Sequence, residues 1–363
     1  MLEYISFDSH RRYTLAEREE KATERCRQAR IEHRRGEIRR YLSDAQPGTP
    51  VAVEATGNWY WIVQEIEEAR CVPKLVHPRK AKLMMGMINK TDKLDVHGFN
   101  RLQRTGTLPT VWIPPAGLRD LRELTRVRMV LSRQRTVLKN RIGATLAKYA
   151  LTVEGYSDAF CRCARPTLEG QIALLPEQTA WACTMLLEQL DFVCKQIGAQ
   201  EQRLKDLLPT SAAMRLLKTL PGVGLILSAV IALEVGDVSR FASAERLASY
   251  AGTTPRVHAS GGKVRYGTLR PDVNRYLKWA FAEAANSVAL HHATHPDRHV
   301  SQLYRRIKGR KGHAKAIGAV ARHLAEAAFH VLGRDQAYRD PAARRNNREP
   351  QTPNNQDASA TLS

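Results

Sequence analysis

The first 114 residues alternate short strand patterns with helix patterns, and this alternation restricts the fold more than any other feature of the chain. Strand patterns come first, at 2–9, 12–19 and 27–33. The segment PVAVEATG at 50–57 is apolar on both faces, which is typical of a strand inside a sheet. Further patterns follow: helices at 36–45 and 58–69, a strand at 72–78 and a helical stretch at 79–105. A strand meander followed by strands between helices predicts a mixed sheet covered by helices, an α/β domain.

Beyond residue 114 the apolar period becomes helical. Two long amphipathic segments, at 115–150 and 178–208, flank a short irregular piece and predict a helical coiled-coil arm. Such an arm either dimerises or packs within one chain. A mostly helical, all-α region with glycine turns follows, and the polar tail has no apolar period, so we expect it to be disordered. The predicted domains are 1–114, 115–210, 211–333 and a tail at 334–363.

The charge of the chain points to a polyanionic partner. Lysine and arginine number 57 against 36 acidic residues, which gives a formal net charge of +21. This excess favours nucleic acid over an anionic membrane surface. The apolar run at 225–235 is far shorter than the roughly 20 residues of a membrane span. The N-terminus lacks the layout of a signal peptide, so we expect a soluble intracellular protein.

The six cysteines carry no local metal motif. There is no CxxC pair in the sequence, and Cys161 and Cys163 have a spacing that suits neither a shared helix face nor ordinary zinc ligation. We therefore expect reduced thiols that fill core positions.

Four acidic residues have the layout of a metal site. Asp8 and Glu54 each end a predicted strand, and Asp92 and Asp95 are three residues apart, which on a helix places both on one face. Carboxylates held in this way suit a hard divalent cation and phosphodiester chemistry. The alternative is ordinary surface or capping acids, with Asp92 near a helix N-terminus.

The segment LKTLPGVGLILSAV at 217–230 combines a helix pattern, a glycine turn at 220–224 and a second helix pattern, and it resembles a helix-hairpin-helix element. Gly222 and Gly224 can adopt positive φ and expose backbone N–H groups beside a helix N-terminus, where they could hold a DNA phosphate. A plain connection between two helices is the alternative.

A single serine stands in a basic stretch at 256–271, RVHASGGKVRYGTLRP. Gly261 and Gly262 would let a phosphate approach Ser260 closely, and His258 could accept its proton. Nearby cations could neutralise phosphoryl oxygens: Arg256, Lys263 and Arg265. From its chemistry alone, this stretch is more typical of a flexible turn than of a catalytic site.

Five segments in order resemble the insertion-sequence 110 family of transposases: FDSH, VAVEATGNWY, LVHP, KTDKLDVHGFNRL and the helical stretch LRELTRVRMVLSRQRTVLKNRIGATL. The resemblance extends to about Leu332. It implies an RNase H-like, RuvC-type N-terminal domain whose DEDD acidic tetrad corresponds to Asp8, Glu54, Asp92 and Asp95.

The resemblance also assigns a nucleophile. The family carries a Ser-Gly-Gly-Lys sequence after Thr-Pro-Arg, and its serine forms a phosphoserine link to DNA; Ser260 is the matching residue. Many relatives have two adjacent serines, whereas this chain has Ala259 before Ser260. A second departure is Pro271, because relatives tend to have a lysine and a glycine before the aspartate. A proline there would alter the turn and affect local DNA contacts.

The expected function is that of a site-specific DNA transposase or recombinase that uses Mg²⁺ or Mn²⁺ and acts on donor and target DNA. The resemblance further implies a structured bridging RNA, a homo-oligomer (dimer or tetramer) and a place in the bacterial cytoplasm with the nucleoid. Two alternatives stay open. One is a junction-resolving nuclease that activates water at the acids, and the other is a nucleic-acid-binding protein without catalysis.

Overall fold

The computed structural model describes residues 3–86, 92–208, 211–269 and 273–341 of the 363. It divides into two compact units, Met1–Pro114 and Pro115–Ser363, which are described separately. Within the described ranges, no helix combines the length and the apolar character needed to cross a bilayer.

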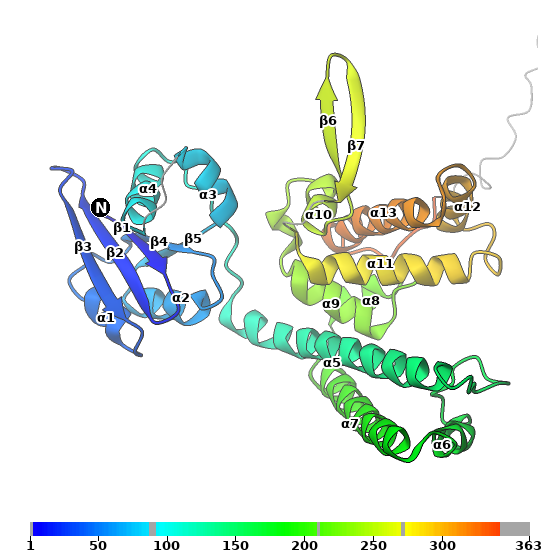
Figure 1. The fold of residues 1–363 in the computed structure, drawn as a ribbon. Helices are drawn as coiled ribbons and strands as arrows, with labels where there is room; N and C mark the ends of the chain where they lie inside the picture. The colour runs from blue at the N-terminus through cyan, green and yellow to red at the C-terminus, as the bar shows by residue number, and fades with distance from the viewer. Residues whose placement is uncertain (1–2, 87–91, 209–210, 270–272, 342–363) are drawn as a thin grey trace, which may run out of the picture. The chain divides into compact units, whose positions relative to one another are not determined.

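The Met1–Pro114 unit is built on a five-stranded mixed sheet (Figure 1). Its strands are β1 Glu3–Ser9, β2 Tyr13–Glu20, β3 Cys26–Glu32, β4 Pro50–Glu54 and β5 Val72–Val76. They lie in the order β3-β2-β1-β4-β5. The first three form an antiparallel meander, while β4 runs parallel to both β1 and β5. The predicted mixed sheet is therefore confirmed.

Helices cover both faces of this sheet (Figure 1). They are α1 Glu37–Tyr41, α2 Trp59–Glu68, α3 Pro78–Met85 and α4 Asp92–Arg104. Successive side chains of β1 point to opposite faces of the sheet. Ile5 and Phe7 point to one face, where they are buried in the core that includes Ile62 of α2. On the other face, the hydroxyl of Ser6 donates to the carbonyl of Val96 at 2.7 Å. This bond holds α4 over the face that also carries Asp8.

The predicted helical stretch at 79–105 is not one helix. Helix α3 ends at Met85, and Gly86 follows in the left-handed conformation, with φ of 61°. A residue without a Cβ adopts this conformation readily, which is why glycine commonly ends a helix. Helix α4 begins at Asp92.

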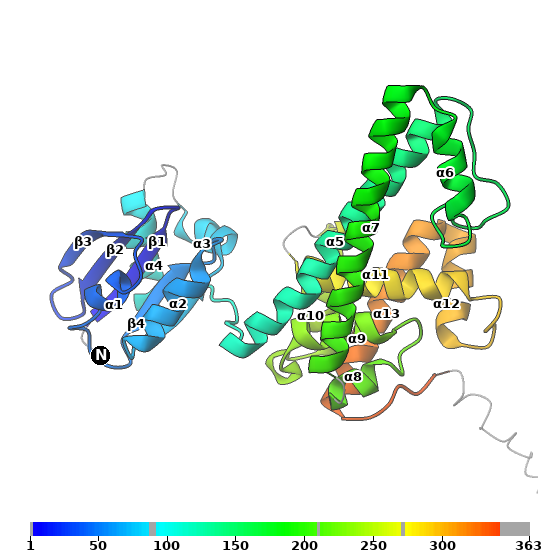
Figure 2. The same ribbon diagram turned by 90° about the horizontal axis from the view of Figure 1, so that it is seen from below.

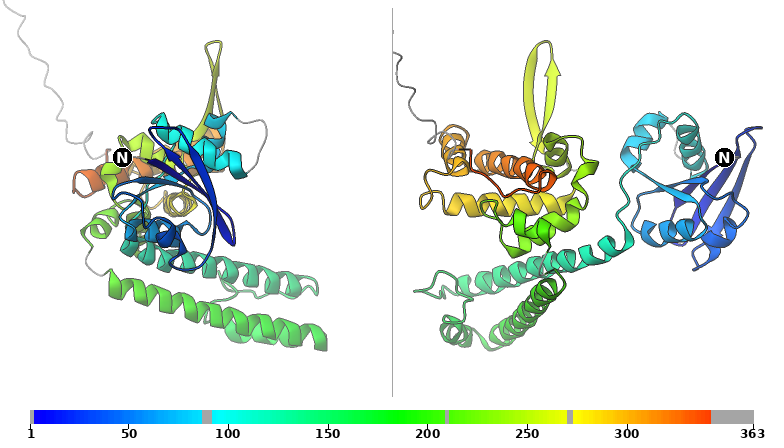
Figure 3. Two further views of the ribbon diagram at one scale, coloured as in Figure 1. Left: turned by 90° about the vertical axis from the view of Figure 1, so that its left-hand side faces the viewer. Right: turned by 180° about the vertical axis from the view of Figure 1, so that it is seen from behind.

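The arm consists of two long helices, α5 Ala116–Ala147 and α7 Glu177–Leu207, which pack against each other (Figure 3). Buried residues of α5, such as Leu138 and Ile142, share one core cluster with Leu187 and Leu190 of α7. The structure therefore shows packing within the chain. The piece predicted to be irregular contains a further helix, α6 Arg165–Ala173, at the end of the arm (Figure 2).

The remainder of the second unit is mostly helical. Its helices are α8 Ala212–Leu217, α9 Leu225–Val235, the short 3-10 helix η1 Val238–Arg240, α10 Ala244–Tyr250, α11 Arg275–Leu290, α12 His299–Lys311 and α13 His313–Gly333. The facing surfaces of α11 and α13 are rich in alanine, including the fully buried Ala284 and Ala325. Small side chains let these helices approach closely.

The basic stretch around Ser260 forms a β-hairpin and is not an irregular turn. Strands β6 Pro255–Ser260 and β7 Lys263–Leu269 pair antiparallel and project from the helices (Figures 1 and 3). Gly261 and Gly262 join them with φ of 54° and 74°. Two successive positive φ angles are what a tight two-residue hairpin turn requires.

The start of the predicted tail is packed. The backbone N–H of Tyr338 donates to the Thr219 hydroxyl at 2.8 Å, and burial raises the pKa of the Tyr338 hydroxyl. The Asp340 carboxylate accepts from the backbone N–H of His299. Residues 342–363, the remainder of the predicted tail, lie outside the described residues.

The prediction that cysteines fill core positions is wrong for half of them. Cys71 and Cys183 are buried, and Cys161 is half-buried. The other three are exposed: Cys26, Cys163 and Cys194.

Candidate active site and DNA interface

Two predicted site residues lie at the carboxyl ends of neighbouring parallel strands. Phe7 of β1 is in register with Val53 of β4, so Asp8 and Glu54 occupy the next positions along each strand. Both side chains line one pocket of about 330 Å³. The carboxyl edge of parallel strands is where α/β sheets commonly bind ligands.

Helix α4 brings a third acid, Asp95, to the same pocket. Asp8 is 6% exposed, whereas Glu54 and Asp95 are half-buried. Asp92 begins α4, three residues before Asp95, and its side chain is outside what the structure describes. The structure thus brings together three of the four predicted acids.

An asparagine that the sequence analysis missed joins the two loops beside the acids. The side-chain oxygen of Asn58 accepts from the Ser9 hydroxyl at 3.0 Å and from the Thr56 hydroxyl at 2.8 Å. Its amide nitrogen donates to the carbonyl of His10 at 2.8 Å. Because Ser9 follows Asp8 and Thr56 lies two residues after Glu54, Asn58 fixes both strand ends relative to each other.

Basic side chains also line the acid pocket. His10 Nε2 lies 3.3 Å from a carboxylate oxygen of Asp8, and α3 contributes Arg79 and Lys82. The full lining is Asp8, Ser9, His10, Glu54, Thr56, Pro78, Arg79, Lys82, Met85, Asp95 and Phe99. The pocket therefore offers carboxylate oxygens for a cation beside Arg79 and Lys82, whose positive charges suit phosphate oxygens. Arg79 and Lys82 belong to the PRKAK sequence after β5, which carried the only sequence signal for them.

The hairpin has a polar face and an apolar face. Ser260 lies opposite Lys263, and His258 lies opposite Arg265. Paired residues of antiparallel strands point to the same side, as do residues two apart, so these four share one face. The opposite face carries two further pairs, Val257 with Tyr266 and Ala259 with Val264.

All of these hairpin residues are exposed. The register shifts between Pro255 and Val257, where Arg256 lies. Pro271 lies outside the described residues. The polar face thus presents a hydroxyl, an imidazole and two cations to solvent.

The glycine turn at 220–224 has a structural reason for its first glycine. Gly222 has φ of 78°, and a Cβ there would collide with the carbonyl oxygen of Ala284 in α11. Gly224 differs from the expectation, because its φ is −93° and it precedes α9 in extended backbone. A cavity of about 740 Å³ adjoins the turn, with Lys218 and Arg298 in its lining beside Asp297 and Asp340.

Comparison with known proteins identifies the family to which a chain with this acid pocket and this hairpin belongs. Residues 8–151 match the family model of DEDD transposases of the IS110 type, described as "Transposase". Residues 214–301 match the model "Transposase IS116/IS110/IS902 family". The chain belongs to the IS110 family of transposases and is a DNA transposase.

Individual relatives match much of the chain. A Pseudomonas aeruginosa protein named "Probable family 20 transposase" is 24% identical over 84% of this chain and 90% of its own length. The "Transposase for insertion sequence element IS1111A" of Coxiella burnetii is 24% identical over 73% of this chain and 72% of its own. An insertion element IS110 protein of Streptomyces coelicolor is 32% identical over 40% of this chain and 35% of its own.

Proposed function

We propose that this transposase cleaves and rejoins DNA with Ser260 as nucleophile and with a metal-binding tetrad of Asp8, Glu54, Asp92 and Asp95. The observation that carries the proposal is the single pocket lined by Asp8, Glu54 and Asp95. The strand order, a meander followed by parallel strands, supports an RNase H-like, RuvC-type fold for this unit. Within the second unit, we propose that the arm at 115–210 and the serine-bearing helical region at 211–333 are separate domains.

The donor atoms of the acid pocket fit Mg²⁺ or Mn²⁺. Carboxylate oxygens are the ligands that these hard cations prefer, and an open pocket leaves room for substrate oxygens. A divalent cation bound there would stabilise negative charge on the phosphate and on the leaving oxygen. Asn58 would keep Asp8 and Glu54 at a constant separation, and Arg79 and Lys82 would bind the DNA backbone.

The two-faced hairpin supports Ser260 as the nucleophile despite Ala259. Ser260 shares its face with Lys263 and Arg265, whereas Ala259 faces Val264 on the apolar side. The serine oxygen would form a bond to phosphorus while the bond to the leaving deoxyribose oxygen breaks. The hydroxyl proton would pass to a base, for which His258 on the same face is one candidate, and the leaving oxygen would take up a proton. Rejoining is the reverse of this exchange.

We propose donor and target DNA and a structured bridging RNA as partners, and a place with the nucleoid in the cytoplasm. The net charge of +21 supports polyanionic partners. The exposed cations of the hairpin would contact phosphates without reading sequence: Arg256, Lys263 and Arg265. Backbone N–H groups of the two glycine turns would do the same, at Gly222 and Gly224 and at Gly261 and Gly262.

We also propose a homo-oligomer, a dimer or tetramer, that forms through the arm. Trp181, Met185 and Phe192 of α7 are 66%, 39% and 60% exposed. At 100° per residue they fall on one side of the helix, opposite the buried Leu187 and Leu190. This exposed stripe, which also contains the acid Glu188, marks an interaction surface.

A second candidate is a junction-resolving endonuclease that activates water. It is favoured by the acid pocket, which lies in a unit that does not contain Ser260. The family assignment favours either enzyme over a nucleic-acid-binding protein without catalysis.

The test is to purify the full chain with the RNA that accompanies it from cells carrying the whole element. The complex is then incubated with labelled element-end DNA and Mg²⁺, and covalent protein–DNA adduct is measured after denaturation. We expect Ser260→Ala to abolish the adduct, and Thr268→Ala, on the same hairpin, to retain it. Undiminished cleavage by Ser260→Ala without an adduct would instead establish water as the nucleophile.

A further inference from the structure

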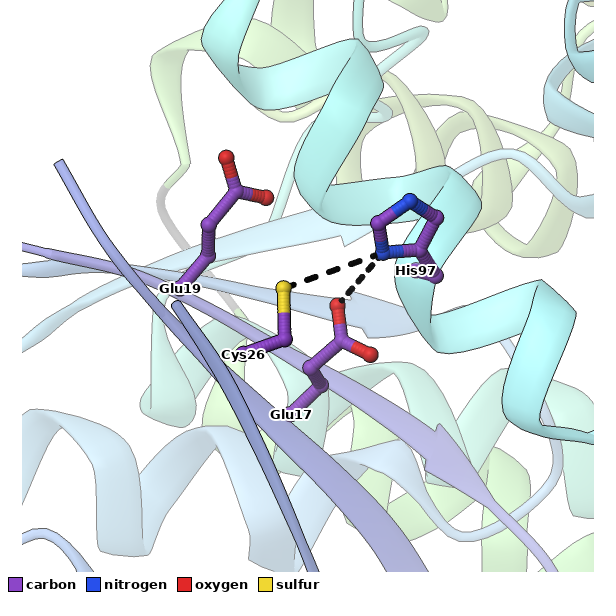
Figure 4. Close-up of side chains that lie close together, drawn as sticks. All are labelled: Glu17, Glu19, Cys26 and His97. Carbon is purple, nitrogen blue, oxygen red and sulfur yellow. Dashed lines mark hydrogen bonds and ion pairs between the residues drawn. The ribbon is translucent and has the colours of Figure 1, made fainter. Parts of the chain in front are cut away.

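A second cluster of metal-ligating side chains lies in the Met1–Pro114 unit (Figure 4). It consists of Glu17 and Glu19 of β2, Cys26 of β3 and His97 of α4. One ligand atom from each residue lies within 4.8 Å of the others. None of the four lines the acid pocket described above.

The sheet register explains why these residues meet. Glu19 is directly opposite Cys26 across the antiparallel pair β2–β3, so both side chains point to the same face. Glu17, two residues earlier, points to that face as well. Helix α4 lies over this face of the sheet, so the His97 side chain lies between the strands and solvent. His97 Nδ1 is 3.2 Å from Glu17 Oε1 and 3.9 Å from Cys26 Sγ.

The two carboxylates are buried, at 1% and 2% exposure for Glu17 and Glu19. Glu17 is well supplied with donors, since Gln28 donates to Oε2 at 2.8 Å and Asn100 to Oε1 at 3.2 Å. Glu19 is not. Its Oε1 pairs with Arg104 at 2.9 Å, but its Oε2 is buried with no hydrogen-bond partner in the part of the chain that the structure describes.

A buried carboxylate oxygen without a donor is costly, and a cation would remove this cost. The mouth of the cluster is open, because Cys26 is exposed and the His97 side chain is 50% exposed. An ion could therefore enter past the thiol and the imidazole and reach the two buried carboxylates.

We propose that Glu17, Glu19, Cys26 and His97 bind one Zn²⁺-class cation. A set of one thiolate, one imidazole and two carboxylates suits the tetrahedral preference of Zn²⁺, whereas Mg²⁺ prefers oxygen ligands alone. The site would tie α4 to β2 and β3 and so hold the helix that carries Asp95. It is independent of the function proposed above, because neither Ser260 nor cleavage enters the argument.

Cobalt binding to the full chain tests the site, because Co²⁺ takes the place of Zn²⁺ and reports a bound thiolate by a charge-transfer absorption. We expect the wild-type protein to bind one Co²⁺ with this absorption, and one equivalent of Zn²⁺ to remove it. Cys26→Ser should abolish the absorption and weaken Zn²⁺ binding at least about tenfold. Cys194→Ser changes an exposed cysteine of α7 and should leave both unchanged.

Two further variants separate this site from the acid pocket. Asp8→Asn should retain the thiolate absorption, and His97→Asn should lose Zn²⁺ affinity while circular dichroism shows an intact fold. Zn²⁺ should also raise the Tm of the wild type but not of Cys26→Ser. The proposal is overturned if wild-type Co²⁺ binding shows no thiolate absorption. It is also overturned if Cys26→Ser binds Zn²⁺ as tightly as the wild type, or if Asp8→Asn alone removes the ion.

Discussion

Asp8 and Glu54 stand one position beyond the in-register residues of two neighbouring parallel strands, and their carboxylates line the same pocket. The residues are 46 positions apart in the sequence. Their proximity follows from the direct pairing of β1 with β4, and α4 then brings Asp95 to them.

Removing one charge from the acid pair should stop catalysis without unfolding the protein. Asp8→Asn and Glu54→Gln each keep the size of the side chain but weaken metal binding, so we expect DNA cleavage to fall by at least about 100-fold. Glu68→Gln, an exposed acid of α2, is the matched control and should cleave normally. Cleavage is measured on labelled element-end DNA in Mg²⁺, and wild-type rates in Asp8→Asn would contradict the proposed metal site.

Moving the serine by one residue should not preserve activity. In the double variant Ala259→Ser/Ser260→Ala, the hydroxyl lies on the face of Val257 and Tyr266, away from Lys263 and Arg265. We expect no phosphoserine adduct from it, whereas Ala259→Ser alone should form the adduct at Ser260. Adduct mapping by mass spectrometry checks this, and a link at position 259 would show that strand facing does not select the nucleophile.

The two glycines of the 220–224 turn should differ in their effect on stability. Gly222→Ala forces a Cβ against the carbonyl of Ala284 at a positive φ, so we expect a loss of at least about 2 kcal/mol in the free energy of unfolding. Gly224→Ala has negative φ and open space but replaces a favourable N-cap residue, and should cost about 1 kcal/mol or less. Urea unfolding compares the two variants, and equal losses would refute the packing explanation.

A buried carboxylate holds α5 against the helical region. Glu234 is fully buried and accepts from Arg126 Nε and from the Asn274 amide, each at 2.8 Å, with Arg122 nearby. Glu234→Ala removes the buried carboxylate that Arg126 and Arg122 contact, and should lower the free energy of unfolding by about 3–5 kcal/mol. The exposed partner of Arg126, Glu123, provides the control, because Glu123→Ala should cost less than about 1 kcal/mol.

The exposed stripe of α7 should control the oligomeric state. Introducing a charge with Phe192→Glu should shift the protein toward monomer in sedimentation at fixed concentration, because it replaces apolar contact area with a second carboxylate one helical turn from Glu188. Gln134→Glu introduces the same charge at an exposed position of α5, outside this stripe, and should sediment like the wild type. An unchanged mass for Phe192→Glu would exclude this stripe as the interface.

Much of the first unit could be predicted because its signals are local. The double-faced apolar run of β4 and the alternation of β1 indicate their places in the sheet. The β6–β7 hairpin also has a local sequence signal. Val257 and Ala259 alternate with polar residues on one side of Gly261 and Gly262, and Val264 and Tyr266 do so on the other. This pattern around two glycines is typical of a tight hairpin.

The sequence by itself determined the order of the five strands of the first sheet, the strand-end positions of Asp8 and Glu54 and the basic context of Ser260. These features depend on periodicity and on residue type within short segments. Only the tertiary structure decided which side chains meet. Cys26 and His97 are 71 residues apart and carry no motif, yet the packing of α4 on β2 and β3 brings them within 3.9 Å. The same packing buries Glu19, because helix and sheet exclude water between them, and no local pattern records that contact.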